Sequence, residues 1–222
     1  MRLEIEQALE SWCGDGQRCI GQILIERSRD DSFVLCHRED ADRDDLTISC
    51  MGEDAAEIAT FDDAGEYRPL RTAPNLRHGW RMELATLREL RHAIDLFYPG
   101  RLAMFFAYRK KELAITPLRE TLNRQSGMYR VATKISDDQI DELVGDFCRS
   151  DRGCLRTILW KRDGIGAIAS TKLPPEKFDP IYDQTGRGGC CIPLLCQEAC
   201  NLLVNECRKI VKMEGAAPSA PE

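Results

Sequence analysis

The sequence predicts an α+β protein in two parts: a small antiparallel sheet with helices, followed by a mostly helical, cysteine-rich domain. Three observations predict this class. Short runs with alternating apolar residues occur before residue 52, and apolar residues recur at helical spacing after residue 80. Seven of the eleven cysteines fall between Cys148 and Cys207. A chain of 222 residues is long enough for one large domain or two modest ones.

The N-terminal elements are predicted from apolar spacing and from the polar turns between them. Residues 3–12 are expected to form a short helix. Strands are predicted over residues 22–26, 32–37 and 46–51. In the third strand, Cys50 shares a face with Leu46 and Ile48, so this face is expected to be buried.

The middle of the chain is predicted to be helical. Residues 80–98 have apolar side chains at helical spacing and are followed by a Pro-Gly pair, which ends helices. Further helices are predicted over residues 102–108 and 117–123. Ser136 is a suitable N-cap for a helix over residues 137–148, whose first turn is acidic.

The domain boundary is predicted near residue 130, ahead of the capped helix. The predicted parts are an N-terminal α+β domain (1–130), a cysteine domain (131–213) and a disordered tail (214–222). In the cysteine domain, residues 155–160 are expected to form a strand and residues 194–212 the last helix. Between them, residues 162–189 form a connection of a length that is uncommon unless it is functional. This loop is expected to cover the cysteine site.

Composition and charge exclude several classes of protein. The net charge of −6 argues against a nucleic-acid-binding surface, which is normally basic. No run approaches the roughly 18 apolar residues of a membrane helix, and the N-terminal segment lacks the apolar core of a secretory signal. A cytoplasmic location is therefore expected. Thiols stay reduced there, so the cysteines are predicted to be ligands or core residues rather than disulfides.

Four cysteines are the predicted ligands of a metal centre: Cys148, Cys154, Cys196 and Cys200. Cys196 and Cys200 are four residues apart, so they would lie one turn apart at the start of the predicted last helix. The helix dipole there stabilises thiolates. The other two flank a predicted chain reversal. Four thiolates from two segments suit either a 4Fe–4S cluster or a closed zinc site.

Neighbouring cysteines leave the ligand set open. Cys190 or Cys191, which follow a Gly-rich loop, could replace Cys148 as the fourth ligand. Cys207 follows Cys200 by seven residues on the same helical stripe, so it is predicted to belong to the core.

The choice between iron and zinc rests on spacing. Structural zinc sites usually have two short cysteine knuckles, often with a histidine. Here the paired cysteines are separated by five and three residues, and the three histidines are far away in sequence. These spacings favour an iron–sulfur cluster, although they do not match the ferredoxin runs.

Other reactive residues are assigned structural roles. The remaining cysteines could form a second metal site, but they are predicted to pack in the core, because two of them lie in predicted strands and alternate with apolar residues; they are Cys13, Cys19, Cys36 and Cys50. The sequence shows no carboxylate partner for any of the three histidines, which are His37, His78 and His92. No catalytic residue is therefore predicted.

Several stretches of the chain resemble a known family. In the second half these are Cys154-Leu-Arg-Thr-Ile-Leu-Trp160 and Cys196-Gln-Glu-Ala-Cys-Asn201. In the first half they are Phe61-Asp-Asp-Ala-Gly-Glu-Tyr-Arg-Pro-Leu70, Gly79-Trp80, Phe97-Tyr-Pro-Gly100 and Arg124-Gln-Ser-Gly-Met-Tyr-Arg130. They resemble the stabilising domain and the 4Fe–4S domain appended to multidomain CbiX-like sirohydrochlorin chelatases. The resemblance implies a 4Fe–4S cluster with cysteine ligands, in a chain from which the chelatase domains are absent.

The sequence thus predicts a cluster-binding protein for electron transfer or an accessory role, with siroheme or cobalamin biosynthesis implied by the resemblance alone. A chelatase or redox protein is the expected partner, and nucleic acid and membrane are not. The first alternative is a non-redox structural or interaction protein held by a four-cysteine zinc site. The second is an enzyme in which three cysteines hold the cluster and the fourth iron meets substrate.

Overall fold

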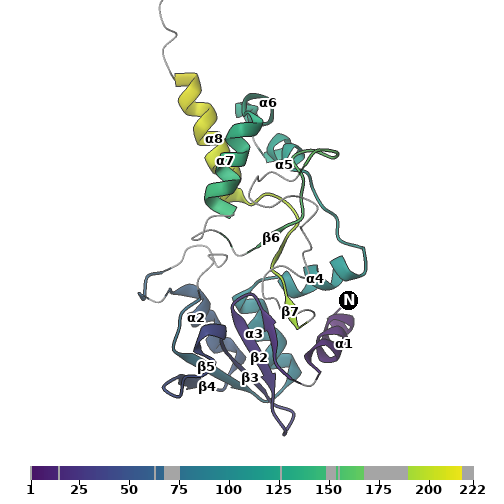
Figure 1. Ribbon diagram of the computed structural model, residues 1–222, viewed down its shortest axis with the longest axis vertical. Coiled ribbons are helices and arrows are strands. Elements are labelled where there is room, and N and C mark those ends of the chain that lie inside the picture. Colours follow the sequence, from purple (N-terminus) through teal and green to yellow (C-terminus); the bar gives the residue numbers. More distant parts are fainter. Residues whose placement is uncertain are drawn as a thin grey trace, which may run out of the picture. The chain divides into compact units, whose positions relative to one another are not determined.

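The computed structural model describes residues 2–14, 16–62, 64–67, 76–125, 127–148, 154, 156–167 and 190–216 (Figure 1). The chain divides into two compact units. The first unit comprises Met1–Leu113 and Ile181–Leu194, and the second comprises Ala114–Pro180 and Leu195–Glu222. The chain therefore leaves the first unit, returns to it late, and then completes the second. Helices and strands are both present, which confirms the α+β class.

The first unit combines a sheet with helices. Its helices are α1 (Arg2–Cys13), α2 (Ala55–Thr60), α3 (Leu87–Phe97) and α4 (Arg101–Arg109), with 3₁₀ turns η1 (Arg38–Asp40) and η2 (Gly52–Asp54). Its strands are β1 (Arg18–Ile20), β2 (Ile23–Arg27), β3 (Phe33–His37), β4 (Thr47–Ser49), β5 (Trp80–Leu84) and β7 (Cys191–Ile192). The helices predicted over residues 3–12 and 102–108 are confirmed by α1 and α4, and the first two predicted strands by β2 and β3.

The sheet of the first unit is mixed rather than antiparallel throughout. Its six strands lie in the order β4-β5-β3-β2-β1-β7. The central pairs are antiparallel, whereas the edge strands β4 and β7 pair in parallel with β5 and β1. Parallel neighbours need long connections, and both edge strands are far in sequence from the strands they pair with.

Helix α3 organises the core of the first unit. It packs against β5, α1, α2 and α4 (Figure 1). Four side chains of α3 face the core and are at most 1% exposed: Leu90, Ala93, Ile94 and Phe97. Trp80 of β5 stacks on Phe97 with 5.0 Å between the ring centroids. Burial of each of the larger side chains, Leu90, Ile94 and Phe97, stabilises the fold by about 1.5–3 kcal/mol.

A tight turn at Gly21 joins β1 to β2. Its φ of 55° is left-handed, a conformation that favours glycine. A Cβ atom here would lie 2.8 Å from the Tyr98 ring and 2.9 Å from the Leu194 side chain. The Tyr98 hydroxyl accepts a hydrogen bond from the Gln22 N–H at 3.0 Å. The turn therefore requires glycine for both its dihedral angle and its space.

The prediction of a single helix over residues 80–98 is wrong for the first residues of this range. Trp80–Leu84 forms β5, in which burial alternates with a two-residue period. Helix α3 begins only at Leu87, because Thr86 and Glu89 form a capping box. The Thr86 hydroxyl accepts the Glu89 N–H at 3.2 Å, and the Glu89 carboxylate accepts the Thr86 N–H at 3.2 Å.

The prediction that one face of the strand at residues 46–51 is buried is also wrong. Ile48 is 59% exposed, and Cys50 is exposed beyond the end of β4. The physical reason is that β4 has only three residues and lies at the sheet edge, where it pairs on one side with β5. The prediction that Cys50 packs in the core is therefore incorrect.

A disulfide joins Cys19 of β1 to Cys191 of β7 in the first unit. The two residues face each other in the parallel register of these strands, with 4.4 Å between their Cα atoms. This distance is within the range that a disulfide spans. The expectation that the cysteines form no disulfide is thus wrong for this pair, which lies 172 residues apart in sequence.

The second unit is mostly helical. Its elements are α5 (Leu118–Gln125), η3 (Gly127–Tyr129), α6 (Val131–Lys134), α7 (Asp137–Cys148), β6 (Thr157–Ile158), β8 (Leu195–Cys196) and α8 (Asn201–Ala216). The predicted N-cap is confirmed, because the Ser136 hydroxyl accepts the Gln139 N–H at 3.2 Å and the Gln139 side chain accepts the Ser136 N–H. Leu118 and Leu122 of α5 share one core with α7 and α8. The predicted boundary near residue 130 thus lies inside this unit.

The last helix begins later than predicted. It starts at Asn201 rather than at residue 194, because Leu195 and Cys196 pair in parallel with Thr157 and Ile158. Of the strand predicted over residues 155–160, the described residues 156–160 form strand only at Thr157–Ile158. Of the predicted connection and tail, residues 168–189 and 217–222 lie outside the described residues. None of the helices in the described ranges is long and apolar enough to cross a bilayer.

Replacing Thr86 tests the start of α3. Thr86→Ala removes the hydroxyl that accepts the Glu89 N–H, so we expect the free energy of unfolding to fall by about 1 kcal/mol. Urea unfolding followed by circular dichroism measures the change. Thr86→Ser keeps the hydroxyl and should retain wild-type stability. An unchanged midpoint in Thr86→Ala would contradict a role for the cap.

Candidate metal centre

Two of the predicted ligands lie at one end of α7. Cys148 is the last residue of this helix. The Cys154 N–H donates a hydrogen bond to the Phe147 carbonyl at 3.0 Å. Carbonyls in the last turn of a helix have no partner inside the helix. The chain therefore returns to the end of α7, and Cys154 comes back beside the turn that carries Cys148.

The pairing of β6 with β8 positions the third predicted ligand, Cys196. Ile158 is its register partner, and the Leu159 N–H donates to the Cys196 carbonyl at 3.0 Å. Trp160 is completely buried, and its indole N–H donates to the Cys196 sulfur at 3.4 Å. The backbone thus holds an N–H donor against this sulfur, an arrangement that influences the electronic properties of a thiolate ligand.

Cys200, the fourth predicted ligand, is exposed and lies directly before α8. The Val204 N–H donates to the Cys200 carbonyl at 3.1 Å, which makes Cys200 the N-cap of the helix. The predicted placement at a helix N-terminus is therefore correct for Cys200. It is wrong for Cys196, which lies in β8, so the two do not share a helix face.

Electrostatics link three of these cysteines. Burial raises the pKa of Cys196 most, the Trp160 N–H and the Arg156 charge oppose it, and negative charge at Cys200 and Cys154 adds to the rise. Negative charge at Cys200 and Cys154 therefore disfavours the thiolate form of Cys196. As a thiol, Cys196 donates to the Glu198 carbonyl at 3.1 Å. Binding a metal removes this proton and leaves the indole N–H as a donor to the sulfur.

The other cysteines have different environments. Cys207 is 1% exposed in the core of the second unit, which confirms the prediction that it packs there. Burial raises the pKa of Cys207 and of Cys13 to about 11, so both thiols stay protonated at neutral pH. Cys36 is buried as predicted. Cys190, an alternative ligand, belongs with its disulfide-bonded neighbour Cys191 to the first unit.

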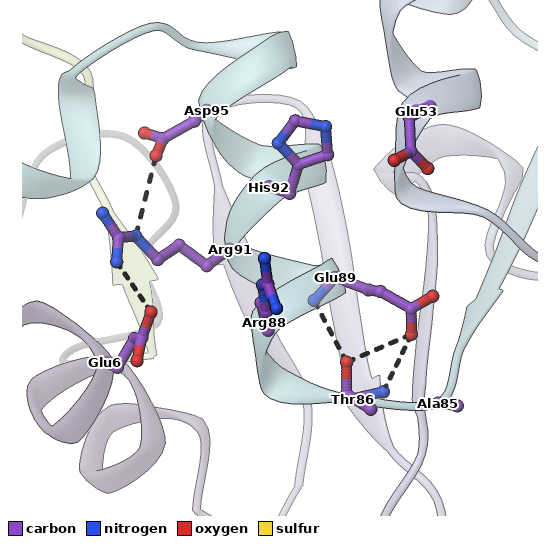
Figure 2. A pocket seen from close by; sticks show the side chains of 9 residues that line it. All are labelled: Glu6, Glu53, Ala85, Thr86, Arg88, Glu89, Arg91, His92 and Asp95. Carbon is purple, nitrogen blue, oxygen red and sulfur yellow. Dashed lines mark hydrogen bonds and ion pairs between the residues drawn. The ribbon is translucent and has the colours of Figure 1, made fainter. Parts of the chain in front are cut away.

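A cavity of about 740 Å³ beside α3 has a different character (Figure 2). Its lining residues are Glu6, Glu53, Ala85, Thr86, Arg88, Glu89, Arg91, His92 and Asp95. Arg91 pairs with Glu6 at 2.8 Å and with Asp95 at 3.8 Å, while Thr86 and Glu89 form the cap of α3. No thiol is among these described lining residues, and much of the charge that they carry is already paired.

One histidine has a carboxylate partner that the sequence did not reveal. The Nδ1 atom of His78 lies 3.1 Å from Oδ1 of Asp40, whose side chain is 4% exposed. Burial raises the pKa of Asp40, but hydrogen bonds from the Gly79 N–H, His78 and Arg43 outweigh it and hold that pKa below its ordinary value. The two partners are 38 positions apart in sequence.

Comparison with known proteins defines the class of each half of the chain. Residues 5–109 match the family described as the DR2241 stabilising domain, and residues 110–209 match the 4Fe–4S iron–sulfur cluster binding domain. The two halves of the chain thus match these two domain families, in this order, and the second half is a 4Fe–4S cluster-binding domain. This agrees with the family resemblance seen in the sequence.

A solved structure from Deinococcus radiodurans, DR2241, is similar over most of the chain. It is described as a multi-domain protein with structural similarity to chelatases and with two additional novel domains. The TM-score is 0.70 at 27% sequence identity, over 94% of this chain. The match covers 41% of that protein, so the chain spans about two fifths of its length. No curated protein matches the chain.

Trp160→Phe tests the indole hydrogen bond to Cys196. Loss of an N–H donor destabilises the more negative, reduced state, so we expect the cluster potential to fall. A hydrogen bond of about 1 kcal/mol corresponds to roughly 40 mV for one electron. Redox titration followed by electron paramagnetic resonance measures the shift. The matched control is Trp80→Phe, which removes an indole that donates to the Arg77 carbonyl instead, and an equal shift there would refute the assignment.

Proposed function

We propose that this chain transfers electrons, or assists an enzyme that does, through a 4Fe–4S cluster held by Cys148, Cys154, Cys196 and Cys200. The graded exposure of the sulfurs carries the proposal. Cys196 is half-buried against the fully buried Trp160, whereas Cys200 is exposed. Such a site is shielded on one side and open on the other, which lets a partner approach without displacing a ligand.

The number of thiolates favours electron transfer over substrate chemistry. Four cysteines supply the ligands that a 4Fe–4S cluster takes from a protein. Lewis-acid catalysis needs an open metal position, which a complete thiolate set does not leave. When bound, the cluster supplies one-electron oxidation and reduction.

Two side chains near Cys196 adjust the charge that this sulfur bears. The Arg156 charge and the Trp160 N–H both favour the thiolate form. Hydrogen bonds and charges beside ligand sulfurs set the reduction potential of such centres. Their combined effect favours the reduced state, because reduction adds negative charge to the site.

We place this activity in tetrapyrrole biosynthesis, for siroheme or cobalamin. Support comes from the structural relative, which is described as similar to chelatases. We propose that a chelatase or a redox protein acts as its partner, rather than nucleic acid or a membrane. A cytoplasmic location completes the proposal, since cytosolic reductants preserve ligand thiols. The Cys19–Cys191 disulfide is an exception to that rule.

Serine variants of the four proposed ligands test the site. Each of Cys148→Ser, Cys154→Ser, Cys196→Ser and Cys200→Ser should lose most of the iron and sulfide that the anaerobically purified protein contains. Wild-type protein should hold about four irons per chain. Cys50→Ser, which alters an exposed cysteine of the first unit, is the control and should keep them. If Cys148→Ser retains the full iron content, the four-thiolate site is refuted and an open iron is favoured.

Reversible reduction tests the electron-transfer role. The cluster-loaded chain should accept and release one electron within roughly −700 to +450 mV, the range of iron–sulfur centres. Protein-film voltammetry combined with iron analysis before and after cycling measures both potential and integrity. Loss of iron on reduction, or no wave in this range, would refute electron transfer and leave a structural role for the cluster.

A further inference from the structure

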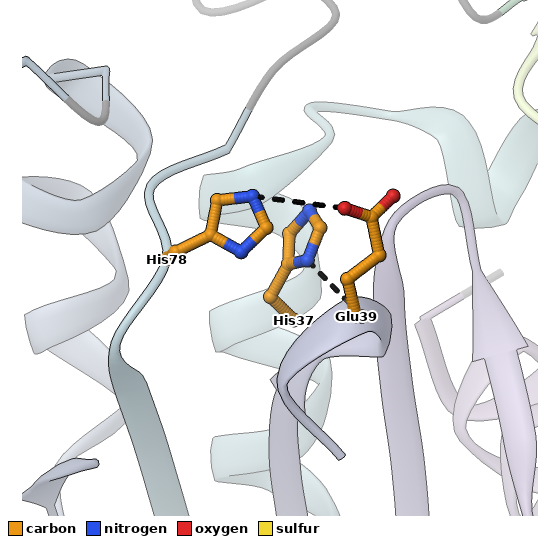
Figure 3. Close-up of side chains that lie close together, drawn as sticks. All are labelled: His37, Glu39 and His78. Carbon is orange, nitrogen blue, oxygen red and sulfur yellow. Dashed lines mark hydrogen bonds and ion pairs between the residues drawn. The ribbon is translucent and has the colours of Figure 1, made fainter. Parts of the chain in front are cut away.

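Three potential metal ligands meet in the first unit, away from any cysteine motif. One ligand atom each from His37, Glu39 and His78 lies within 4.8 Å of the others. Figure 3 shows both imidazole rings and the Glu39 carboxylate turned toward one another. His37 is fully buried, whereas the Glu39 side chain is 63% exposed. The group is thus anchored in the core and open to solvent on the Glu39 side.

Strand pairing brings these residues together. Strands β3 and β5 are antiparallel, with Cys36 opposite Arg81, so the residues after β3 lie beside those that precede β5. Gly79 secures this junction: its φ of 80° is left-handed, its carbonyl accepts the Thr47 N–H at 2.9 Å, and its own N–H donates to Asp40 at 2.7 Å. The approach of the two histidines is therefore built into the sheet.

Asp40 fixes the orientation and tautomer of His78. Its buried carboxylate accepts hydrogen bonds from the Gly79 N–H and from Arg43 at 3.1 Å. A carboxylate held by such donors is an acceptor, so the 3.1 Å contact assigns the proton of neutral His78 to Nδ1. The lone pair is then on Nε2, which faces the Glu39 carboxylate at 3.9 Å. Histidine ligands of metals usually donate their other ring N–H to a carboxylate, a backbone carbonyl or water, and Asp40 is such an acceptor.

His37 requires one adjustment to act as a ligand. Its Nδ1 accepts the Glu39 N–H at 3.2 Å and caps η1, which assigns the proton of the neutral ring to Nε2. Figure 3 shows Nε2 turned toward the gap between His78 and the Glu39 carboxylate. Metal binding through Nε2 moves this proton to Nδ1, which would then face the Glu39 N–H as a second donor. The ring must therefore turn away from η1, and the cap hydrogen bond is lost. The exposed Glu39 side chain can then close on the ion.

We propose that His37, Glu39 and His78 bind a divalent transition-metal ion, zinc or iron(II), with Asp40 as a positioning residue. Two imidazoles and one carboxylate suit these ions, and three protein ligands leave coordination positions open for water or a small ligand. All the residues belong to the first unit, so the site does not depend on the cysteine centre or on the proposed electron transfer.

Zinc titration with histidine-specific detection tests this site. The full, cluster-loaded chain, labelled with ¹⁵N-histidine, is titrated anaerobically with Zn²⁺ alone, so that the ligand cysteines are occupied by iron. The chain has three histidines, and the signals of His37 and His78 should shift together and saturate at one equivalent. The His92 signal should not move. An absence of shifts, or shifts at His92 alone, would overturn the proposal. A His78 ring that carries protons on both nitrogens and whose signals do not change on addition of Zn²⁺ would also overturn it.

Variants separate ligation from structure. His78→Ala and Glu39→Gln should each weaken Zn²⁺ binding at least roughly tenfold, and Asp40→Asn about 10–100-fold. His92→Ala is the matched control and should bind as the wild type does. Asp40→Asn should also change the ¹⁵N shifts that report the His78 tautomer, which a merely structural role would not do. Wild-type zinc affinity in both His78→Ala and Glu39→Gln would overturn the proposal.

Discussion

The parallel pairing of β6 with β8 is the interaction on which the cysteine centre depends. Because Ile158 is the register partner of Cys196, Trp160, two residues after the end of β6, lies close enough for its indole N–H to reach the Cys196 sulfur. The same pairing keeps residues 195–196 out of α8, so that Cys200 rather than Cys196 caps this helix. Two short strands thus decide which sulfur is shielded and which is exposed.

Local signals in the sequence predicted much of the fold, and failures occurred where non-local pairing decides. The N-cap at Ser136 and the helix it begins were predictable, because a capping side chain and its helix are neighbours in sequence. Trp80–Leu84 was misjudged since its apolar residues fit a helix as well as a strand. These residues form a strand because they pair with β3. The exposure of Ile48 likewise follows from the edge position of β4, which composition does not disclose.

The sites show the same division. The clustering of cysteines in the sequence predicted a metal centre, and the family resemblance indicated that the centre is a 4Fe–4S cluster. The strand at Cys196 and the disulfide between Cys19 and Cys191 depend on registers between distant segments, so spacing in the sequence could not predict them. The pairing of His78 with Asp40 depends in the same way on β3 lying beside β5. A histidine without a carboxylate nearby in sequence can therefore have one as its hydrogen-bond partner in the fold.

The interleaved path of the chain also constrains its biosynthesis. N-terminal domains ordinarily fold first as a chain is made, but the sheet of the first unit takes its edge strand from Cys191–Ile192. Until the ribosome has made those residues, β1 presents backbone groups that no later strand has yet covered. Open edges of this kind invite pairing with other chains. A nascent chain paused before residue 190 is therefore the form of this protein that depends most on chaperones.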